Sequence, residues 1–323
     1  MKNVTYLFGA GASAGAVPPS DSLRDNIKRL GDDIDVYPFP NSQLFDQLKH
    51  EFAADCKWLF EETHETTIDA RAIQWKERPS EMKRLKLVLA LTLSFWQRTK
   101  KVDPRYENFY SRLPLKDKQI PENVTILSWN YDSQFELSYA NYFVINEPWS
   151  RYWSTKQNLK VLSKHYNIGA DYKNYRILQL NGNACELKSG GVEVSLFAWD
   201  RELDSYEGLL TAYVKFRNLD SNSSISFATA DEPSTGKRTI VDVAMDVVKT
   251  TDILFVVGYS FPDTNKKTDT KLLTAMLANL ELVVIQDRQP ALVEKAIRKI
   301  LGSGYNVSNL EIEHEGYSKF YVE

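Results

Sequence analysis

Several short segments of this sequence join glycine to polar side chains that could hold a dinucleotide. The first is Gly9–Ser13, with the sequence GAGAS, directly after an apolar N-terminal run. Its glycines allow a sharp turn that brings bare N–H groups against a pyrophosphate, and Ser13 adds a hydroxyl donor. Its spacing matches a dinucleotide-binding signature, although such glycines also serve close helix–strand packing. We expect this loop to contact phosphate.

Polar side chains close three further apolar runs. Asn130 and Asp132 lie two residues apart in SWNYD, Asn181 precedes a glycine in LNG, and Ser260 follows Gly258. A carboxamide and a carboxylate at a strand end could hold a ribose hydroxyl or a water, although Asn-Tyr-Asp alone also fits a turn or a helix cap. Four strand ends of this kind suggest one shared site.

The elements that position these residues alternate between strands and helices. The expected strands are Val4–Phe8, Val124–Ser128, Arg176–Leu180, Val192–Ala198, Ile253–Val257, Leu282–Ile285 and Leu310–Glu313. The expected helices between them are Leu23–Leu30, Tyr131–Phe143, Leu209–Arg217, Val241–Lys249, Thr268–Leu280 and Pro290–Leu301. This alternation predicts an α/β fold with a doubly wound, parallel, Rossmann-like sheet, whose ligand lies at the carboxyl ends of the strands.

One region departs from this alternation. From about residue 42 to residue 101, leucines and aromatic residues recur at three- and four-residue spacings and glycine is absent, which predicts helices. We therefore expect a Rossmann-like NAD-binding domain formed by residues 1–31 and 120–323, with an all-helical insertion at 32–119. The polar stretch Leu219–Lys237 is expected to be a mobile loop over the site.

Composition limits the remaining possibilities. The formal charge of −3 argues against a dedicated nucleic-acid binder, which usually carries a basic excess. No apolar run reaches the roughly 18 residues of a membrane span, and no signal peptide is evident, so a cytoplasmic protein is expected. Cys56 and Cys185 are far apart and form no CxxC pair, so neither a disulfide framework nor a zinc site, nor any other metal site, is expected.

In order and in context, the segments resemble those of the sirtuins, and more closely the divergent sirtuin-like domains of bacterial anti-phage defence systems. Gly9–Ser13 resembles the opening Gly-Ala-Gly-x-Ser of the family, and Gly15–Pro18 stands where Gly-Ile-Pro usually does. Ser128–Asp132 resembles Thr-Gln-Asn-Ile-Asp, and Gly258–Phe261 resembles the later Gly-Thr-Ser. The resemblance covers the Rossmann elements, about half of the chain, and not the helical insertion.

The resemblance implies that NAD is bound, as substrate or as ligand. It assigns the contacts by strand end, with Gly9, Ala10, Gly11 and Ser13 around the phosphates, Asn130 and Asp132 at the nicotinamide ribose, and Gly258 and Ser260 at the phosphate and adenosine ribose. Asp287 could accept a hydrogen bond from an adenosine ribose hydroxyl or, equally, cap the helix that begins at Pro290.

Two departures from the family pattern matter. The zinc module of deacetylating sirtuins is missing, which puts protein deacetylation in doubt. Asn181 stands where the family has the histidine of Leu-His-Gly, a general base, and a carboxamide cannot take a proton at neutral pH. The protein could be weak or inactive, Asn130 and Asp132 could suffice, or a histidine could have been changed to asparagine. The four histidines are His50, His64, His165 and His314, of which only His165 is a candidate substitute.

The expected activity is NAD glycohydrolysis, which releases nicotinamide and ADP-ribose. Asn130 would orient the attacking water, Asp132 would hold the ribose or stabilise its developing positive charge, and residue 181 would complete the site. The resemblance implies an anti-phage effector that drains NAD in abortive infection. It also implies a homo-oligomer that could partner a HerA-type ATPase or a nucleic-acid-guided protein.

Two other functions compete with hydrolysis. A non-catalytic sensor of NAD or ADP-ribose, or an assembly module, is favoured by Asn181. A Rossmann oxidoreductase is disfavoured, because its acidic ribose reader would fall at Asp32 or Asp33, in an unpersuasive Gly-Asp-Asp turn.

Overall fold

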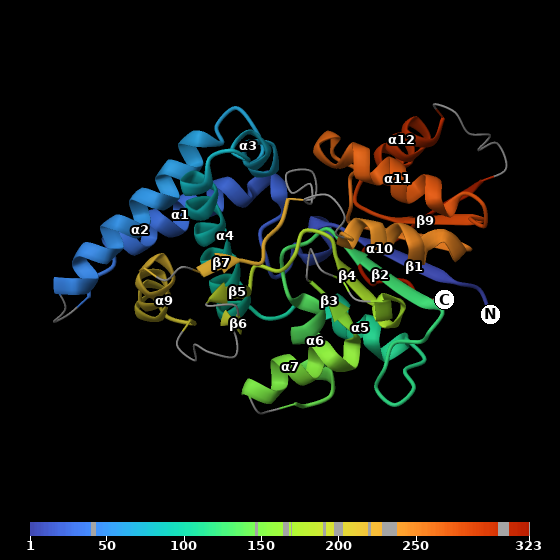
Figure 1. Cartoon of the computed structure of the whole chain (residues 1–323), viewed down its shortest axis with the longest axis horizontal. Coiled ribbons are helices and arrows are strands. Elements are labelled where there is room, and N and C mark those ends of the chain that lie inside the picture. The colour runs from blue at the N-terminus through green and yellow to red at the C-terminus, as the bar shows by residue number, and fades with distance from the viewer. Residues whose placement is uncertain are drawn as a thin grey trace.

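The protein is represented by a computed structural model (Figure 1) that describes residues 1–39, 43–145, 148–163, 168, 170–189, 192–196, 203–218, 221–227, 238–302 and 310–322. The histidine expected as a candidate base, His165, lies outside these residues, as does most of the polar stretch Leu219–Lys237.

A parallel sheet of seven strands forms the centre of the α/β part. Its strands are β1 (Val4–Phe8), β2 (Val124–Ser128), β3 (Val161–Leu162), β4 (Ile177–Gln179), β8 (Ile253–Val257), β9 (Leu282–Gln286) and β10 (Glu311–Glu315). Their spatial order is β10-β9-β8-β1-β2-β4-β3. The chain therefore winds outward from β1 in one direction and from β8 in the other, which confirms the predicted doubly wound, Rossmann-like fold.

The strand ends at the middle of this sheet are in register. Phe8 pairs with both Ser128 and Val257, Ser128 pairs with Gln179, and Val257 pairs with Gln286. Since parallel strands leave the sheet at the same edge, the loops after β1, β2, β4, β8 and β9 start side by side. This register places the polar segments of the sequence at one edge.

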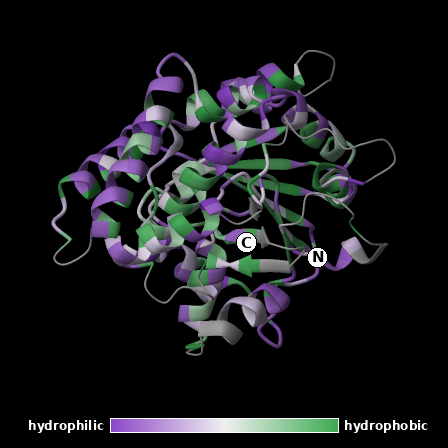
Figure 2. Cartoon of the chain, turned by 60° about the vertical axis from the view of Figure 1, so that its left-hand side comes forward, coloured by the Kyte–Doolittle hydropathy of each residue, from purple (hydrophilic) through white to green (hydrophobic). Residues whose placement is uncertain are grey.

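Helices cover both faces of the sheet, because alternate residues of each strand point to opposite sides. Leu7 packs in one cluster with α10 (Ile240–Val247), α11 (Lys266–Met276) and α12 (Pro290–Leu301). Phe8 packs in another with α5 (Pro104–Arg112) and α6 (Gln134–Tyr142), where its ring meets Tyr106 and Phe135. Figure 2 shows the central strands as a hydrophobic layer between helices whose outer residues are hydrophilic.

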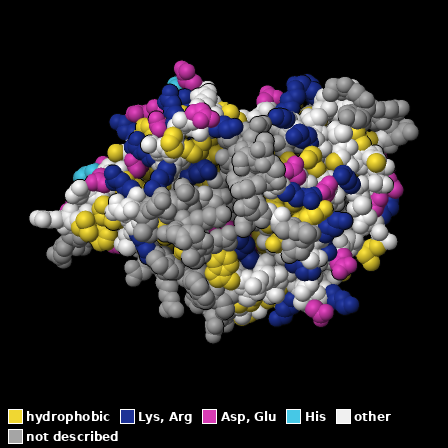
Figure 3. Space-filling model, viewed as in Figure 1, with side chains coloured by type: hydrophobic (Ala, Val, Ile, Leu, Met, Phe, Trp, Pro, Cys, Tyr) yellow, Lys and Arg dark blue, Asp and Glu magenta, His cyan; other side chains and the backbone are white. Residues whose placement is uncertain are grey.

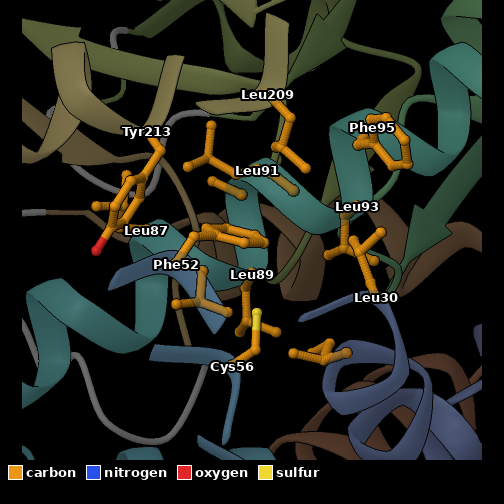
Figure 4. Packing of buried hydrophobic residues seen from close by; sticks show 14 of the residues in the cluster. Leu30, Phe52, Cys56, Leu87, Leu89, Leu91, Leu93, Phe95, Leu209 and Tyr213 are labelled. Carbon is orange, nitrogen blue, oxygen red and sulfur yellow. The ribbon is translucent and has the colours of Figure 1, made fainter. Parts of the chain in front are cut away.

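A helical layer lies beside the sheet, at the left of Figure 1. Its members are α1 (Ser20–Val36), α2 (Gln43–Glu62), α3 (Ile68–Gln74), α4 (Pro79–Thr99) and α9 (Tyr206–Asn218). Its interior is mainly apolar, with Leu89, Phe52 and Cys56 each completely buried (Figure 4). The division of the chain into a Rossmann-like domain and an insertion at 32–119 stays a prediction. In the packing, α1 and α9 belong to the helical layer, whereas α5 lies on the sheet.

One predicted strand belongs to a different sheet. The strand expected at Val192–Ala198 appears as β6 (Val192–Ser195), which pairs antiparallel with β5 (Glu186–Ser189). With β7 (Ser221–Ser223) these strands form a small separate sheet. The expectation of a strand in the parallel sheet was wrong here, because β6 follows β5 too closely for the crossover that a parallel neighbour needs, and the two strands form a hairpin instead.

The surface carries mixed charge. On the face seen in Figure 3, Lys and Arg side chains alternate with Asp and Glu over the described residues. Among the helices that the structure describes, none has both the length and the apolar character needed to cross a membrane.

One further helix, α7 (Pro148–Leu159), packs against α6. The remaining elements are the 3-10 turns η1 (Ala10–Ser13), η2 (Ala170–Asn174), η3 (Val248–Thr250) and η4 (Asp263–Asn265).

Candidate functional site

A cavity of about 480 Å³ lies at the carboxyl edge of the sheet, within the usual range of small-molecule sites. Nine of the ten residues that the sequence proposed for the site line it, namely Ala10, Gly11, Ser13, Asn130, Asp132, Asn181, Gly258, Ser260 and Asp287. Gly9 is not among the lining residues, because it lies behind the loop against β8. The strand ends therefore converge on one cavity, as expected.

The loops after β1 and β8 are in direct backbone contact. The amide of Gly9 donates to the carbonyl of Val257 and that of Gly11 to the carbonyl of Gly258, both at 3.0 Å. Gly258 has a φ of +59°, and a Cβ added to it would lie 2.3 Å from the nitrogen of Ala12. The glycines are thus needed for this crossing, and the amides of Gly9 and Gly11 are not bare donors for a pyrophosphate, in contrast to the sequence expectation.

Ser13 joins the β1 loop to the β2 loop. Its Oγ lies 2.7 Å from the hydroxyl of Tyr106 and accepts a hydrogen bond of 3.1 Å from Nδ2 of Asn130. Ser13 is only 2% exposed. Its hydroxyl therefore organises the neighbouring polar residues, whereas the sequence had suggested a direct phosphate contact.

Asn130 has one end of its carboxamide bound and the other buried without a partner among the described residues. Its Nδ2 donates a hydrogen bond to Oγ of Ser13, while its buried Oδ1 has no hydrogen-bond partner among the described residues. A buried acceptor without a partner costs free energy, on the order of 1–3 kcal/mol. Because Asn130 also lines the cavity, this oxygen suits a donor group from a ligand or an ordered water.

Asp132 is a buried carboxyl group that also lines the cavity. Burial raises its pKa to about 6, against the opposing effects of hydrogen bonds from Ser13 and from the amide of Gln134. The Gln134 amide donates to Oδ1 at 3.1 Å, at the first residue of α6. Asp132 therefore serves the start of a helix and the cavity wall together, whereas its role toward a ribose or a water stays a prediction.

Asn181 is held between two loops. The side-chain Nδ2 of Asn181 donates to the backbone carbonyl of Trp129 at 2.9 Å. The backbone carbonyl of Asn181 accepts from the amide of Ser226 at 2.8 Å. Gly182 follows with a φ of +71°, where an added Cβ would lie 1.9 Å from the carbonyl oxygen of Ser224. The side chain at 181 thus reaches the cavity from a rigid turn.

Asp287 is not the N-cap of the helix that begins at Pro290, which was the alternative role proposed for it from the sequence. The N-cap of α12 is Gln289, and Asp287 instead accepts a hydrogen bond from the Gln289 amide at 2.8 Å. Asp287 lines the cavity at the end of β9. Its carboxylate is thus available to a ligand from a tight turn before the helix.

Sequence reasoning missed several cavity residues, among them Arg288 after β9 and two residues from helices, Arg105 and Asp69. Arg105 forms an ion pair of 2.6 Å with Asp103 and donates to the carbonyl of Ala12 at 2.9 Å, so it braces the β1 loop from α5. Asp69 reaches the cavity from α3 and accepts a hydrogen bond from the hydroxyl of Tyr131. Asp69 lies in the first turn of a helix, where a carboxylate is common, so no local pattern marks it as a site residue.

None of the histidines that the structure describes lines the cavity. His50 pairs with Asp35, and His314 pairs with Glu294, in both cases at the surface. His64 is exposed. In the described part of the chain, therefore, histidine does not replace the base that Asn181 cannot supply.

A buried cluster of polar side chains, Glu136, Gln179 and Asn183, lies next to the site. Oε1 of Glu136 accepts from Gln179 at 3.1 Å and from Asn183 at 3.5 Å. Burial raises the pKa of Glu136 to about 8. The group is therefore protonated at neutral pH, which avoids a buried negative charge beside Asp132.

Comparison with known proteins supplies no relative: no family model and no curated protein matches the chain. Among the described residues, no group of three or more His, Cys, Asp or Glu is arranged to hold a metal ion. The cavity itself offers carboxylates, a free carboxamide oxygen and two arginines, Arg105 and Arg288. These groups can accept hydrogen bonds from sugar hydroxyls and balance the charge of a phosphate.

The crossing of the two loops can be tested at Gly258. Replacement by alanine should lower the free energy of unfolding by about 1–3 kcal/mol, because of the left-handed φ and the contact with Ala12. Gly316→Ala is the control, since no atom lies within 4 Å of its added Cβ, and should change stability by less than about 0.5 kcal/mol. Urea unfolding measures both, and equal stabilities would contradict the crossing.

Glu136 should make stability depend on pH. The folded protein keeps a proton that the unfolded chain releases, because the pKa of Glu136 is raised from its ordinary 4.5 to about 8, so the free energy of unfolding should fall as pH rises through that window. Glu136→Gln keeps an acceptor oxygen and cannot ionise. At pH 9 the variant should exceed wild type by on the order of a few kcal/mol, and at pH 5 the two should be similar. Denaturant unfolding at both pH values measures this, and parallel pH profiles would refute it.

Proposed function

We propose that the chain binds NAD in this cavity and hydrolyses the nicotinamide–ribose bond to nicotinamide and ADP-ribose. The observation that carries the proposal is Asn130, which lines the same cavity as Asp132 and whose buried Oδ1 has no hydrogen-bond partner among the described residues. A ligand with hydroxyl groups would satisfy that oxygen. The cavity lies where the strand order reverses, the usual place for a nucleotide in a doubly wound sheet.

The dinucleotide would extend along the sheet edge from β2 to β9. Gly258, Ser260 and Asp287 would face the adenosine end, where a carboxylate accepts hydrogen bonds from ribose hydroxyls. Arg288 would supply positive charge near the pyrophosphate, while Arg105, whose charge is balanced by Asp103, would hold the β1 loop in place. With the amides of Gly9 and Gly11 already bound, Arg288 and the remaining wall of the β1 loop would carry the phosphate contacts.

The chemistry would be performed at the nicotinamide ribose. Oδ1 of Asn130 would accept a hydrogen bond from the attacking water and orient it. Asp132, held by Ser13 and the start of α6, would bind a ribose hydroxyl or stabilise the positive charge that develops as nicotinamide leaves. The burial of both residues excludes bulk water, which strengthens these interactions.

A second candidate is a non-catalytic sensor of NAD or ADP-ribose, or an assembly module. Asn181 favours it, because the amide cannot take a proton and its Nδ2 is already bonded to the carbonyl of Trp129. The resemblance of the sequence motifs supports a wider proposal for either function. In that proposal the chain is a homo-oligomeric, cytoplasmic anti-phage effector in abortive infection, with a HerA-type ATPase or a similar protein as partner.

Turnover of NAD by purified protein tests the proposal. We expect nicotinamide and ADP-ribose to appear, and Asn181→His to raise the rate by about tenfold or more, since a positioned base is worth about 10²–10⁴. Asn130→Ala should abolish release. Asn279→Ala, at an exposed asparagine that does not line the cavity, is the matched control and should keep the wild-type rate.

The competing functions give different results. Tight NAD binding by calorimetry with no turnover by wild type or Asn181→His would favour the sensor. A change in absorbance of reduced nicotinamide would favour an oxidoreductase. No measurable binding by either protein would contradict both NAD proposals.

A further inference from the structure

Asp69 brings a carboxylate to the cavity from the helical layer. It lies in the first turn of α3, next to Thr67 and Ile68, and all three line the cavity. The amide of Ala70 is capped by the side chain of Thr67 at 3.1 Å. Asp69 is therefore not required as the cap of its own helix, and its carboxylate points elsewhere.

The partner of Asp69 is the residue between the two polar groups of the β2 loop. The hydroxyl of Tyr131 donates to Oδ1 of Asp69, and the Tyr131 ring packs edge-on against Phe227, with ring centroids 6.0 Å apart. The carbonyl of Tyr131 accepts from the amide of Ala184 at 2.7 Å. Tyr131 is thus held by three contacts, and it holds Asp69 in the wall of the cavity that Asn130 and Asp132 also line.

Burial makes the carboxylate of Asp69 more basic. Desolvation raises the pKa of Asp69, while the hydrogen bond from Tyr131 acts in the opposite direction. A carboxylate with a raised pKa is a better proton acceptor than an exposed one. The environment of Asp69 is therefore that of an acid–base group and not of a surface aspartate.

Hydrolysis leaves one proton to be placed. The C1′–N bond breaks and its electron pair goes to nicotinamide, which leaves as a neutral molecule. The water oxygen then bonds to C1′, and one water proton must depart. Asn181 cannot accept it, and Asp132 is engaged with the ribose in the function proposed above.

We propose that Asp69 is a further catalytic residue of this site, the acceptor of the proton from the attacking water. The proposal rests on the proposed NAD hydrolysis. The proton passes from water to a carboxylate oxygen of Asp69 and then to solvent, so the overall reaction yields nicotinamide, ADP-ribose and one proton. The helical layer thereby supplies part of the chemistry, and the sheet supplies the binding edge.

The experiment separates the capture of water from the cleavage of the glycosidic bond. Exchange of labelled nicotinamide into NAD requires cleavage but no deprotonated water, whereas hydrolysis requires both. Asp69→Asn should bind NAD within about threefold of wild type, lose hydrolysis by about 100-fold and keep most of its exchange. The ratio of exchange to hydrolysis should therefore rise by more than tenfold.

The helical layer also contains a control for Asp69, a second aspartate that is hydrogen-bonded to a tyrosine hydroxyl. Asp55 accepts a hydrogen bond of 2.7 Å from the hydroxyl of Tyr213 but does not line the cavity. Asp55→Asn should keep the wild-type ratio of exchange to hydrolysis. Asp69→Ser, which removes the carboxylate by a different change, should repeat the result of Asp69→Asn, and thermal unfolding reports whether either variant is folded.

Three outcomes overturn the assignment to Asp69. They are unaltered hydrolysis in both Asp69 variants, an equal loss of exchange and hydrolysis in folded variants, and NAD binding without turnover by wild type and Asn181→His. The last of these leaves NAD binding standing. If wild type and Asn181→His fail to bind NAD at all, the proposed function itself fails, which calorimetry distinguishes from the other cases.

Discussion

Close backbone contact between the loops after β1 and β8 determines the shape of the site. Gly258 adopts its left-handed conformation where a side chain would collide with Ala12, and its carbonyl receives the amide of Gly11 at 3.0 Å. The crossing lies at the point where the strand order reverses, so a cavity opens beside it. Substitution of any of these glycines would move one loop and, with it, the residues that Ser13 holds.

A series of hydrogen bonds that begins at this crossing positions the polar groups of the site. Ser13 is placed by the β1 loop, its hydroxyl orients Asn130 and supports Asp132, and Tyr131 extends from the same segment to Asp69 in the helical layer. The sheet and the helices therefore meet through hydrogen bonds as well as through apolar packing. A ligand bound at the edge would contact both layers.

Much of the fold could be predicted, since short buried strands leave a strong apolar pattern. The strands at Val4–Phe8, Val124–Ser128 and Ile253–Val257 and the helix Pro290–Leu301 were predicted to the residue. Val192–Ser195 was assigned to the wrong sheet, because pairing partners depend on loop length and tertiary contact.

The site was predictable only in part. Convergence of the strand ends follows from parallel topology, so the sequence located Asn130 and Asn181 correctly at the cavity. It could not show that the Gly11 amide is used internally, because that depends on how closely two distant loops approach. Asp69 and Arg105 come from helices whose placement no local pattern reveals.

The most direct measurement is a crystal structure of the chain with NAD. The account predicts density for intact or cleaved NAD in the cavity, with a water or a ribose hydroxyl about 3 Å from Oδ1 of Asn130 and the adenosine end near Asp287. A dinucleotide bound on another face, or Oδ1 of Asn130 still without a partner in the bound state, would contradict it.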